Sequence, residues 1–243
     1  GPKGGFLKED RLLTFKAFIP PVFSFGGPVW FPIRSKLKGA VKRLQTIQNN
    51  ALRAVTGCHA AASSQHVHDE CKVLPVREHI AMQCTQFLVN SRQAMHPSNE
   101  VTGRPPGARP DMKPTLQHCF AREAVNYTTD GAITEMALKR AIKDIHTKAV
   151  TDVRAKRSPN RVLGVPPPEV HPSEASLPQC YRDSLSQLRS DYCQNLQSYQ
   201  KFINNVNDDN CPSCQSSPHT TSHLFSCQAA PTPLKPIDLW ERP

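Results

Sequence analysis

Four residues near the end of the chain have the types and the spacing of a metal site. Cys211, Cys214, His223 and Cys227 form the pattern C-x₂-C-x₈-H-x₃-C. Two thiolates separated by two residues can hold a tetrahedral ion from one tight loop, and a His and a Cys four positions apart share one face of a helical turn. Because these side chains would fill all four positions of a zinc ion, the pattern predicts a structural zinc that stabilises a tail too short for its own core.

A second histidine competes for the same role. His219 gives C-x₂-C-x₄-H, the first half of a nucleocapsid-type zinc knuckle, but seven residues then separate it from Cys227 where a knuckle has four. The spacing therefore favours His223 and leaves His219 as the alternative ligand. A polar loop that binds no metal is the remaining alternative.

Other polar residues do not form a catalytic set by their spacing. Asp208 and Asp209 could suggest the paired aspartates of a polymerase, but they lie in the polar run NNVNDDN, which predicts a turn. His66 and His68 are two positions apart and are expected to point in different directions, without a suitably spaced acid or thiol partner. We therefore expect no catalytic centre in this chain and no small-molecule substrate.

Composition narrows the class of partner. The chain has 243 residues and a net charge of +10, and residues 1–60 hold ten Lys or Arg against two acids. A basic surface of this kind favours phosphate backbones of RNA or DNA through counterion release. Nine cysteines without a signal peptide indicate reduced thiols, so we expect a nuclear or cytoplasmic protein. The apolar runs are too short for a membrane span, and no membrane partner is expected.

The elements that must position these residues are predicted to be helices. Apolar residues recur at steps of three and four over 35–57, 76–88, 133–149 and 177–203. Good helix formers over 7–18 and a serine start at 63 or 64 predict two further helices, of which the first is expected to end at Pro20-Pro21 and the second at Cys71. The expected fold class is mainly α. Its parts are a helical segment over 1–95, a proline-rich linker and loop over 96–130, a helical region over 131–205 and the zinc-bound tail over 206–243.

The helix predicted over 35–57 is the candidate nucleic-acid surface. Its apolar residues define one face, and the opposite face carries the four cations Lys38, Lys42, Arg43 and Arg53. These side chains are predicted to contact the phosphate backbone without reading sequence. A solvated helix face is the alternative.

Several phrases, in their order along the chain, resemble the C-terminal part of non-LTR retrotransposon reverse transcriptases, particularly the jockey-like group. The resemblance covers nearly the whole chain, and one departure is Asp191, where Gly is usual. The phrases are Leu12–Ala17, Phe25–Trp30, Leu44–Asn49, Ala51–Arg53, Thr56-Gly57, Leu74–Val76, Asn160–Leu163, Leu185–Ser190, the Cys/His tail and Asp238–Trp240.

The resemblance implies a part of an RNA-directed DNA polymerase that handles template and primer during target-primed reverse transcription. The resemblance also implies that residues 1–95 form a thumb-like helical segment. In that family the thumb grips the nucleic-acid duplex, and the catalytic aspartates would lie before Gly1. The segment alone is therefore expected to be inactive as a polymerase. The alternative from another class is a zinc-stabilised helical module that binds a protein and has no nucleic-acid role.

Overall fold

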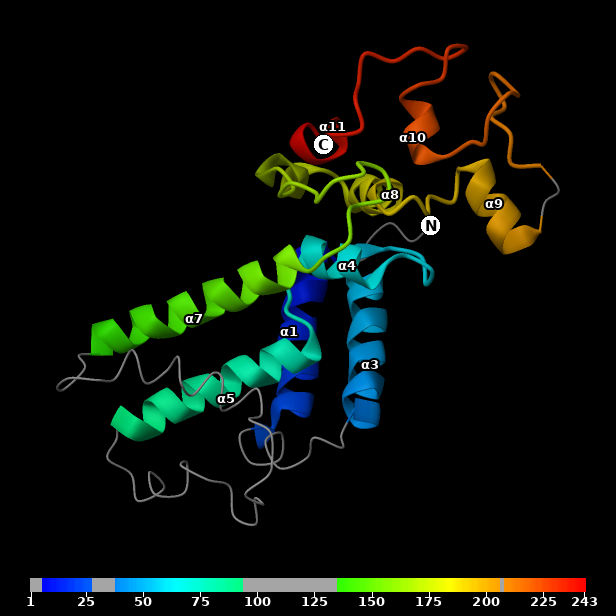
Figure 1. The fold of residues 1–243 in the computed structure, drawn as a ribbon. Helices are drawn as coiled ribbons and strands as arrows, with labels where there is room; N and C mark the ends of the chain where they lie inside the picture. Colours follow the sequence, from blue (N-terminus) through cyan, green and yellow to red (C-terminus); the bar gives the residue numbers. More distant parts are fainter. Residues whose placement is uncertain (1–5, 28–37, 94–134, 206–207) are drawn as a thin grey trace. The chain divides into compact units, whose positions relative to one another are not determined.

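The computed structural model describes residues 6–27, 38–93, 135–205 and 208–243, and this part of the chain is mainly helical (Figure 1). Its only β pairing there is an isolated bridge between Asn210 and Pro218. The mainly α fold class is therefore confirmed. The helices are α1 Lys8–Ser24, α3 Lys38–Thr56, α4 Ser64–Cys71, α5 Val76–Gln93, α7 Glu135–Ala155, the 3₁₀ helix η2 Pro172–Ser176, α8 Gln179–Arg189, α9 Gln197–Asn204, α10 Thr221–Leu224 and α11 Asp238–Glu241.

The chain divides into two compact units. Unit 1 comprises residues 1–15, 49–73 and 157–243, and unit 2 comprises 16–48 and 74–156. The linker predicted over 96–130 lies outside the described residues, and the predicted domain boundaries stay predictions. None of the described helices combines the length and the apolar composition needed to cross a membrane.

Among the described residues of unit 2, α5 contributes to two apolar clusters. One cluster joins Phe23 of α1 to Val76, Ile80 and Cys84 of α5, and the other contains Leu74 and Met82 with Ile145 and Ala149 of α7. Val76, Ile80 and Cys84 recur at steps of four, as do Ile145 and Ala149, so burial of one face explains why α5 and α7 are helices.

Two glutamines of α3 hold the start of α5. Gln48 is fully buried and its Nε2 donates to the carbonyl of Leu74 at 3.0 Å, while Gln45 Oε1 accepts from the amide of Val76 at 2.8 Å. The bond to Val76 satisfies an amide that the first turn of a helix leaves without a partner, and the bond to Leu74 fixes the carbonyl just before that turn. The polar residues of the Leu44–Asn49 phrase thus have a structural role against the Leu74–Val76 phrase.

The expectation that Pro20-Pro21 ends the first helix is wrong. Helix α1 continues through both prolines to Ser24. Prolines remove two backbone donors, but their fixed φ is compatible with a helix, and Ser24 Oγ donates to the carbonyl of Pro20 at 2.6 Å. Burial of Phe23 in the unit 2 core stabilises the last turn of α1, which follows the prolines. Local sequence rules do not include this packing.

Unit 1 replaces the long helix predicted over 177–203 with two shorter ones, α8 and α9. Asp191 has a left-handed φ of +63°. Its amide donates to Leu188 O and the amide of Tyr192 donates to Gln187 O, which is the Schellman pattern that ends a helix. Asp191 Oδ1 also accepts from the amide of Thr221 at 2.9 Å, so an Asp occupies a position that otherwise favours Gly.

Candidate functional sites

The tail of unit 1 brings the four predicted ligands together. The ligand atoms of Cys211, Cys214, His223 and Cys227 all lie within 4.8 Å of one another. Cys211 Sγ is 3.9 Å from Cys227 Sγ, and Cys214 Sγ is 3.3 Å from His223 Nε2. A tetrahedron with Zn–S bonds of about 2.3 Å has edges of about 3.8 Å, so the cluster has the dimensions of a four-ligand metal site.

Short local elements position these side chains. The amide of Cys211 donates to Ser217 O and the amide of Gln215 donates to Cys211 O, both at 2.8 Å, which closes the tight loop of the Cys pair. Gln215 takes a left-handed φ of +55° in that loop. Thr220 caps α10 because its hydroxyl accepts from the amide of His223 at 3.2 Å. This cap fixes His223 in the single turn of α10, next to Cys214.

Hydrogen bonds favour thiolate character at the Cys pair. Two hydrogen bonds lower the pKa of Cys214 to about 6. The larger effect comes from the Ser216 hydroxyl and the smaller from the Ser216 backbone. Backbone hydrogen bonds from Cys214 and Ser213 lower the pKa of Cys211. Since thiolate is the form that binds metal, these donors prepare the loop for a cation.

The alternative ligand His219 lies outside the cluster. Its Nδ1 accepts from the amide of Gln197 at 3.2 Å, and its carbonyl accepts from Ser198 Oγ at 2.9 Å. His219 therefore joins the start of α9 to the tail, while His223 faces the sulfurs. Asp209 pairs with Lys201, and Asp208 Oδ1 accepts from the amide of Asn210 at 2.9 Å.

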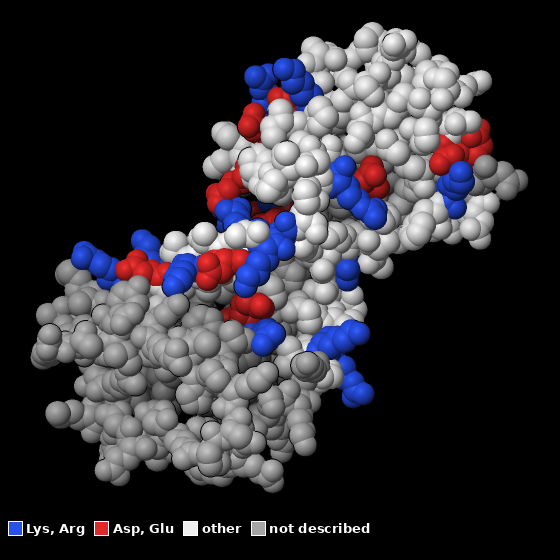
Figure 2. All heavy atoms as spheres, viewed as in Figure 1, with Lys and Arg blue, Asp and Glu red and all other residues white. Residues whose placement is uncertain are grey.

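The four cations predicted on α3 have different environments. Lys42 and Arg43 are exposed. Arg53 instead donates from Nε and Nη2 to the carbonyl of Ala62, at 3.1 and 2.8 Å, so it fixes the loop before α4. The side chain of Lys38 lies outside the described residues. Helix α3 contains no Asp or Glu, and basic side chains along it show no acidic neighbour in Figure 2, whereas α7 carries both signs.

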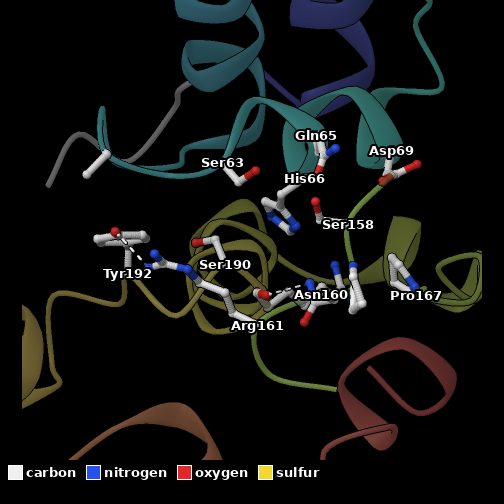
Figure 3. Close-up of a pocket in the computed structure, with 13 residues that line it drawn as sticks. Ser63, Gln65, His66, Asp69, Ser158, Asn160, Arg161, Pro167, Ser190 and Tyr192 are labelled. Atoms are coloured by element: carbon white, nitrogen blue, oxygen red, sulfur yellow. Dashed lines mark hydrogen bonds between the residues drawn. The ribbon is translucent and has the colours of Figure 1, made fainter. Parts of the chain in front are cut away.

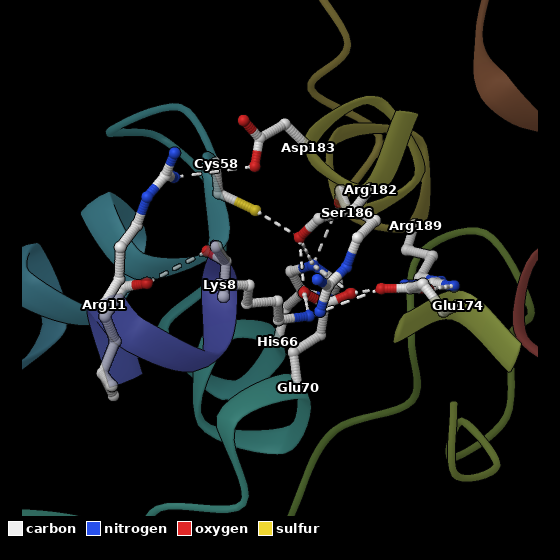
Figure 4. A network of polar contacts seen from close by, with 12 residues as sticks. Lys8, Arg11, Cys58, His66, Glu70, Glu174, Arg182, Asp183, Ser186 and Arg189 are labelled. Atoms are coloured by element: carbon white, nitrogen blue, oxygen red, sulfur yellow. Dashed lines mark hydrogen bonds and ion pairs between the residues drawn. The ribbon is translucent and has the colours of Figure 1, made fainter. Parts of the chain in front are cut away.

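A buried ionic network in unit 1 was not predicted from the sequence (Figure 4). Glu70 of α4 accepts from Arg189 of α8 at 2.8 Å, from Lys8 of α1 at 3.2 Å and from the hydroxyl of Ser186 at 2.5 Å. Arg189 also pairs with Glu174 of η2 and donates from Nε to Leu239 O at 2.8 Å. The side chains of Arg189 and Glu70 are 0% and 2% exposed, so the charges compensate one another away from water.

The expectation that His66 lacks a spaced partner is wrong. His66 precedes Glu70 by four residues, and its Nε2 lies 4.0 Å from the carboxylate and 3.1 Å from Ser186 O. This i,i+4 spacing was visible in the sequence. The other members of the network are more than 60 residues from Glu70 along the chain, so no local pattern connects them.

The network keeps Glu70 ionised. Burial alone would raise its pKa, but the charges of Lys8, His66 and Arg189 outweigh burial and lower the pKa to about 2. Burial lowers the pKa of His66. The arrangement therefore holds an ionised carboxylate among compensating cations.

A pocket of about 330 Å³ lies beside this network (Figure 3). Its walls are the start of α4, the turn at 158–161 and the end of α8. Ser63, His66, Asn160, Arg161 and Tyr192 line it. The sequence indicated none of these residues as a site, because they come from three separate segments.

Comparison with known proteins found no matching family model, curated protein or solved structure. The functional argument therefore rests on the residues and on their geometry. The phrases that carry the family resemblance do meet in unit 1: Gln187 Nε2 donates to Gly57 O at 3.0 Å, and Asn160 Nδ2 donates to Arg189 O at 3.1 Å.

Proposed function

We propose that this chain is a zinc-stabilised, helical nucleic-acid-binding segment, similar to the C-terminal part of a non-LTR retrotransposon reverse transcriptase. The observation that carries the proposal is the Cys211, Cys214, His223 and Cys227 cluster, whose ligand atoms lie within 4.8 Å of one another. In the family that the sequence resembles, a Cys/His tail of this kind helps to handle template and primer. The chain contributes binding and no polymerase chemistry.

Zinc is the metal that suits this donor set. Three sulfurs and one imidazole nitrogen are soft and borderline ligands, which select zinc over magnesium or calcium. When bound, zinc would join the Cys loop to α10 and to Cys227 and so stabilise the fold of the tail. Because protein side chains would fill all four positions, the metal has a structural role.

Helix α3 supports the nucleic-acid part of the proposal. Lys42 and Arg43 are exposed neighbours on a helix without acidic residues, so no carboxylate of α3 competes with a phosphate for them. Arg53 has an intrachain role at Ala62, which makes Lys42 and Arg43 the principal contacts. Such contacts hold the backbone of a duplex and do not read its bases.

The test is binding of the zinc-loaded full chain to a short RNA–DNA primer duplex over a salt series. Each phosphate contact adds about one unit to the slope of log K against log salt, so Lys42→Ala/Arg43→Ala should lower the slope by about two. The loss should be similar for different duplex sequences, because backbone contacts carry no sequence information.

The matched control removes two exposed cations from α7. Arg140→Ala/Lys143→Ala changes the net charge equally on a helix that also carries Asp144 and Asp152, and it should leave the slope close to that of the wild type. Equal slopes for the α3 variant and the wild type would overturn the proposal. Stronger binding to an acidic polypeptide than to the duplex would instead support the protein-interaction function.

A further inference from the structure

The pocket of unit 1 offers a second surface with the chemistry of a ligand site. It is enclosed by α4 on one side and by the 158–161 turn and the end of α8 on the other, as Figure 3 shows. Its volume of about 330 Å³ is at the lower end of the range for small-molecule pockets, roughly 300 to 1,000 Å³. A space of this size suits one nucleotide unit.

The charges that line the pocket leave one cation without a compensating carboxylate. Asp69 pairs with Arg157, and Arg189 pairs with Glu70 and Glu174. Arg161 makes no ion pair with any described residue and is exposed. The pocket therefore has a net positive charge at its open side, which favours an anion.

Several polar groups of the pocket have no partner among the described residues. The side chains of Ser63, Gln65 and Ser158 make no hydrogen bond there, and Ser63 does not cap the helix that it precedes. Hydroxyl and amide groups at the mouth of a pocket can bind phosphate oxygens or the edges of a base.

Within the part of the chain that the structure describes, one group of the pocket without a partner is a ring nitrogen of His66. His66 is 6% exposed and lines the pocket. Its Nε2 faces Ser186 O and the Glu70 carboxylate, both acceptors, so Nε2 carries the proton and Nδ1 is left as an acceptor without a partner among the described residues. A ribose hydroxyl or a base amino group can donate to this nitrogen.

Aromatic rings extend from the mouth of the pocket. The Arg161 guanidinium lies 5.6 Å from the centre of the Tyr192 ring and donates to its hydroxyl at 2.9 Å. Tyr192 contacts Phe202, whose side chain is 59% exposed, with ring centres 5.9 Å apart. A cation held beside an exposed aromatic ring is the combination that binds a phosphate and stacks the neighbouring base of a single strand.

We propose that this pocket binds one nucleoside phosphate of a single-stranded nucleic acid, with the phosphate at Arg161 and the base between the pocket and the Tyr192–Phe202 pair. The inference rests on the proposed function and adds a single-strand site to the duplex surface of α3. Ser63 and Ser158 supply further donors to the phosphate, and His66 Nδ1 accepts from the sugar or the base.

The experiment measures fluorescence anisotropy of a labelled oligouridine with the zinc-loaded full chain. Arg161→Ala should weaken binding about tenfold, the loss expected for one charge-assisted contact, and lower the salt slope by about one. Arg161→Lys keeps the charge and should recover part of the affinity. Circular dichroism and zinc content of Arg161→Ala that match those of the wild type exclude a folding defect as the cause.

Lys235→Ala is the matched control, since it removes one exposed cation of unit 1 away from the pocket and should leave affinity unchanged. Ultraviolet cross-linking with peptide mapping should place the oligonucleotide on the Tyr192 or Phe202 peptide. Competition by uridine monophosphate would assign the pocket to a free nucleotide unit, and competition only by longer strands would assign it to a chain.

Wild-type affinity in Arg161→Ala, with cross-links elsewhere, would overturn the pocket assignment. If duplex binding then still depends on Lys42 and Arg43, the proposed function stands without this site. A wild-type chain that binds neither the duplex nor the oligouridine would overturn both proposals.

Discussion

At the scale of single residues, the tail shows how two histidines four positions apart acquire different roles. His223 follows the Thr220 cap, and its Nε2 reaches Cys214 Sγ at 3.3 Å. His219 precedes the cap and accepts from the amide of Gln197. The helix start at Thr220 therefore decides which imidazole faces the sulfurs, and the zinc proposal follows this geometry.

The two histidines can be separated by metal content. We expect one zinc per intact chain by elemental analysis, with most of it lost in His223→Ala and in Cys214→Ser, because each variant removes one of four ligands. His219→Ala should keep the metal and lose only the bond to α9. Chelation of the wild type should expose amides over 209–227 to hydrogen exchange, while α3 and α5 keep their protection. Zinc retained in His223→Ala but lost in His219→Ala would reverse the assignment.

At the scale of elements, the ends of helices decide how unit 1 packs. Helix α3 ends at Thr56, and Gly57 follows with a left-handed φ of +70°. A Cβ on Gly57 would lie 2.5 Å from the carboxylate of Asp183 on α8, so the glycine is required both for the turn and for the close approach. Gly164 has the same conformation, with φ at +68°, but its Cβ would meet open space.

These glycines form a matched pair for a stability measurement. Gly164→Ala should cost about 1 to 2 kcal/mol in free energy of unfolding, the cost of the left-handed conformation alone. Gly57→Ala should cost about 1 to 3 kcal/mol more, because Asp183 must move as well. Chemical denaturation of both variants measures the difference. Equal losses would show that α8 adjusts to the added methyl group at no cost.

At the scale of the whole molecule, the buried network joins segments of unit 1 that are far apart in sequence. Glu70 and Arg189 connect α1, α4, η2 and α8, and Arg189 reaches Leu239 O and lies 5.7 Å from the Trp240 ring. A buried charge network adds little net stability compared with apolar packing, yet removal of one member leaves the others uncompensated. The network therefore specifies which segments come together.

Removal of the central carboxylate should have a large and pH-dependent effect. Glu70→Gln should lower the free energy of unfolding by about 3 to 5 kcal/mol at neutral pH. The folded pKa of Glu70, about 2, lies below its ordinary value of 4.5, so the wild type keeps this stabilisation above about pH 4.5 and loses it as the pH falls toward 2. Denaturation at a series of pH values should show the two proteins converging in acid.

The control for this prediction is the exposed pair of Lys72 and Glu169, 2.9 Å apart, with side chains 65% and 60% exposed. Glu169→Gln should change stability by less than about 1 kcal/mol, since solvent screens the pair. A constant difference between wild type and Glu70→Gln across the acid range would contradict the assigned pKa. Metal loss in acid affects both proteins equally, so it does not produce the convergence.

The sequence by itself determined the helical class, most helix positions and the Cys/His set, because each depends on residues within a few turns of one another. Spacing of apolar residues placed α3, α5 and α7, and a serine start placed α4. Ligand spacing selected Cys211, Cys214, His223 and Cys227. The i,i+4 pair of His66 and Glu70 had the same local character.

Only the tertiary structure decided the rest. Helix α1 continues through its prolines because Phe23 is buried against α5, and α8 stops at Asp191 because that residue also binds the amide of Thr221. The Glu70 network and the Arg161 pocket join side chains that are distant along the chain. Periodicity and spacing describe neighbours in sequence, whereas burial and charge compensation depend on which segments the fold brings together.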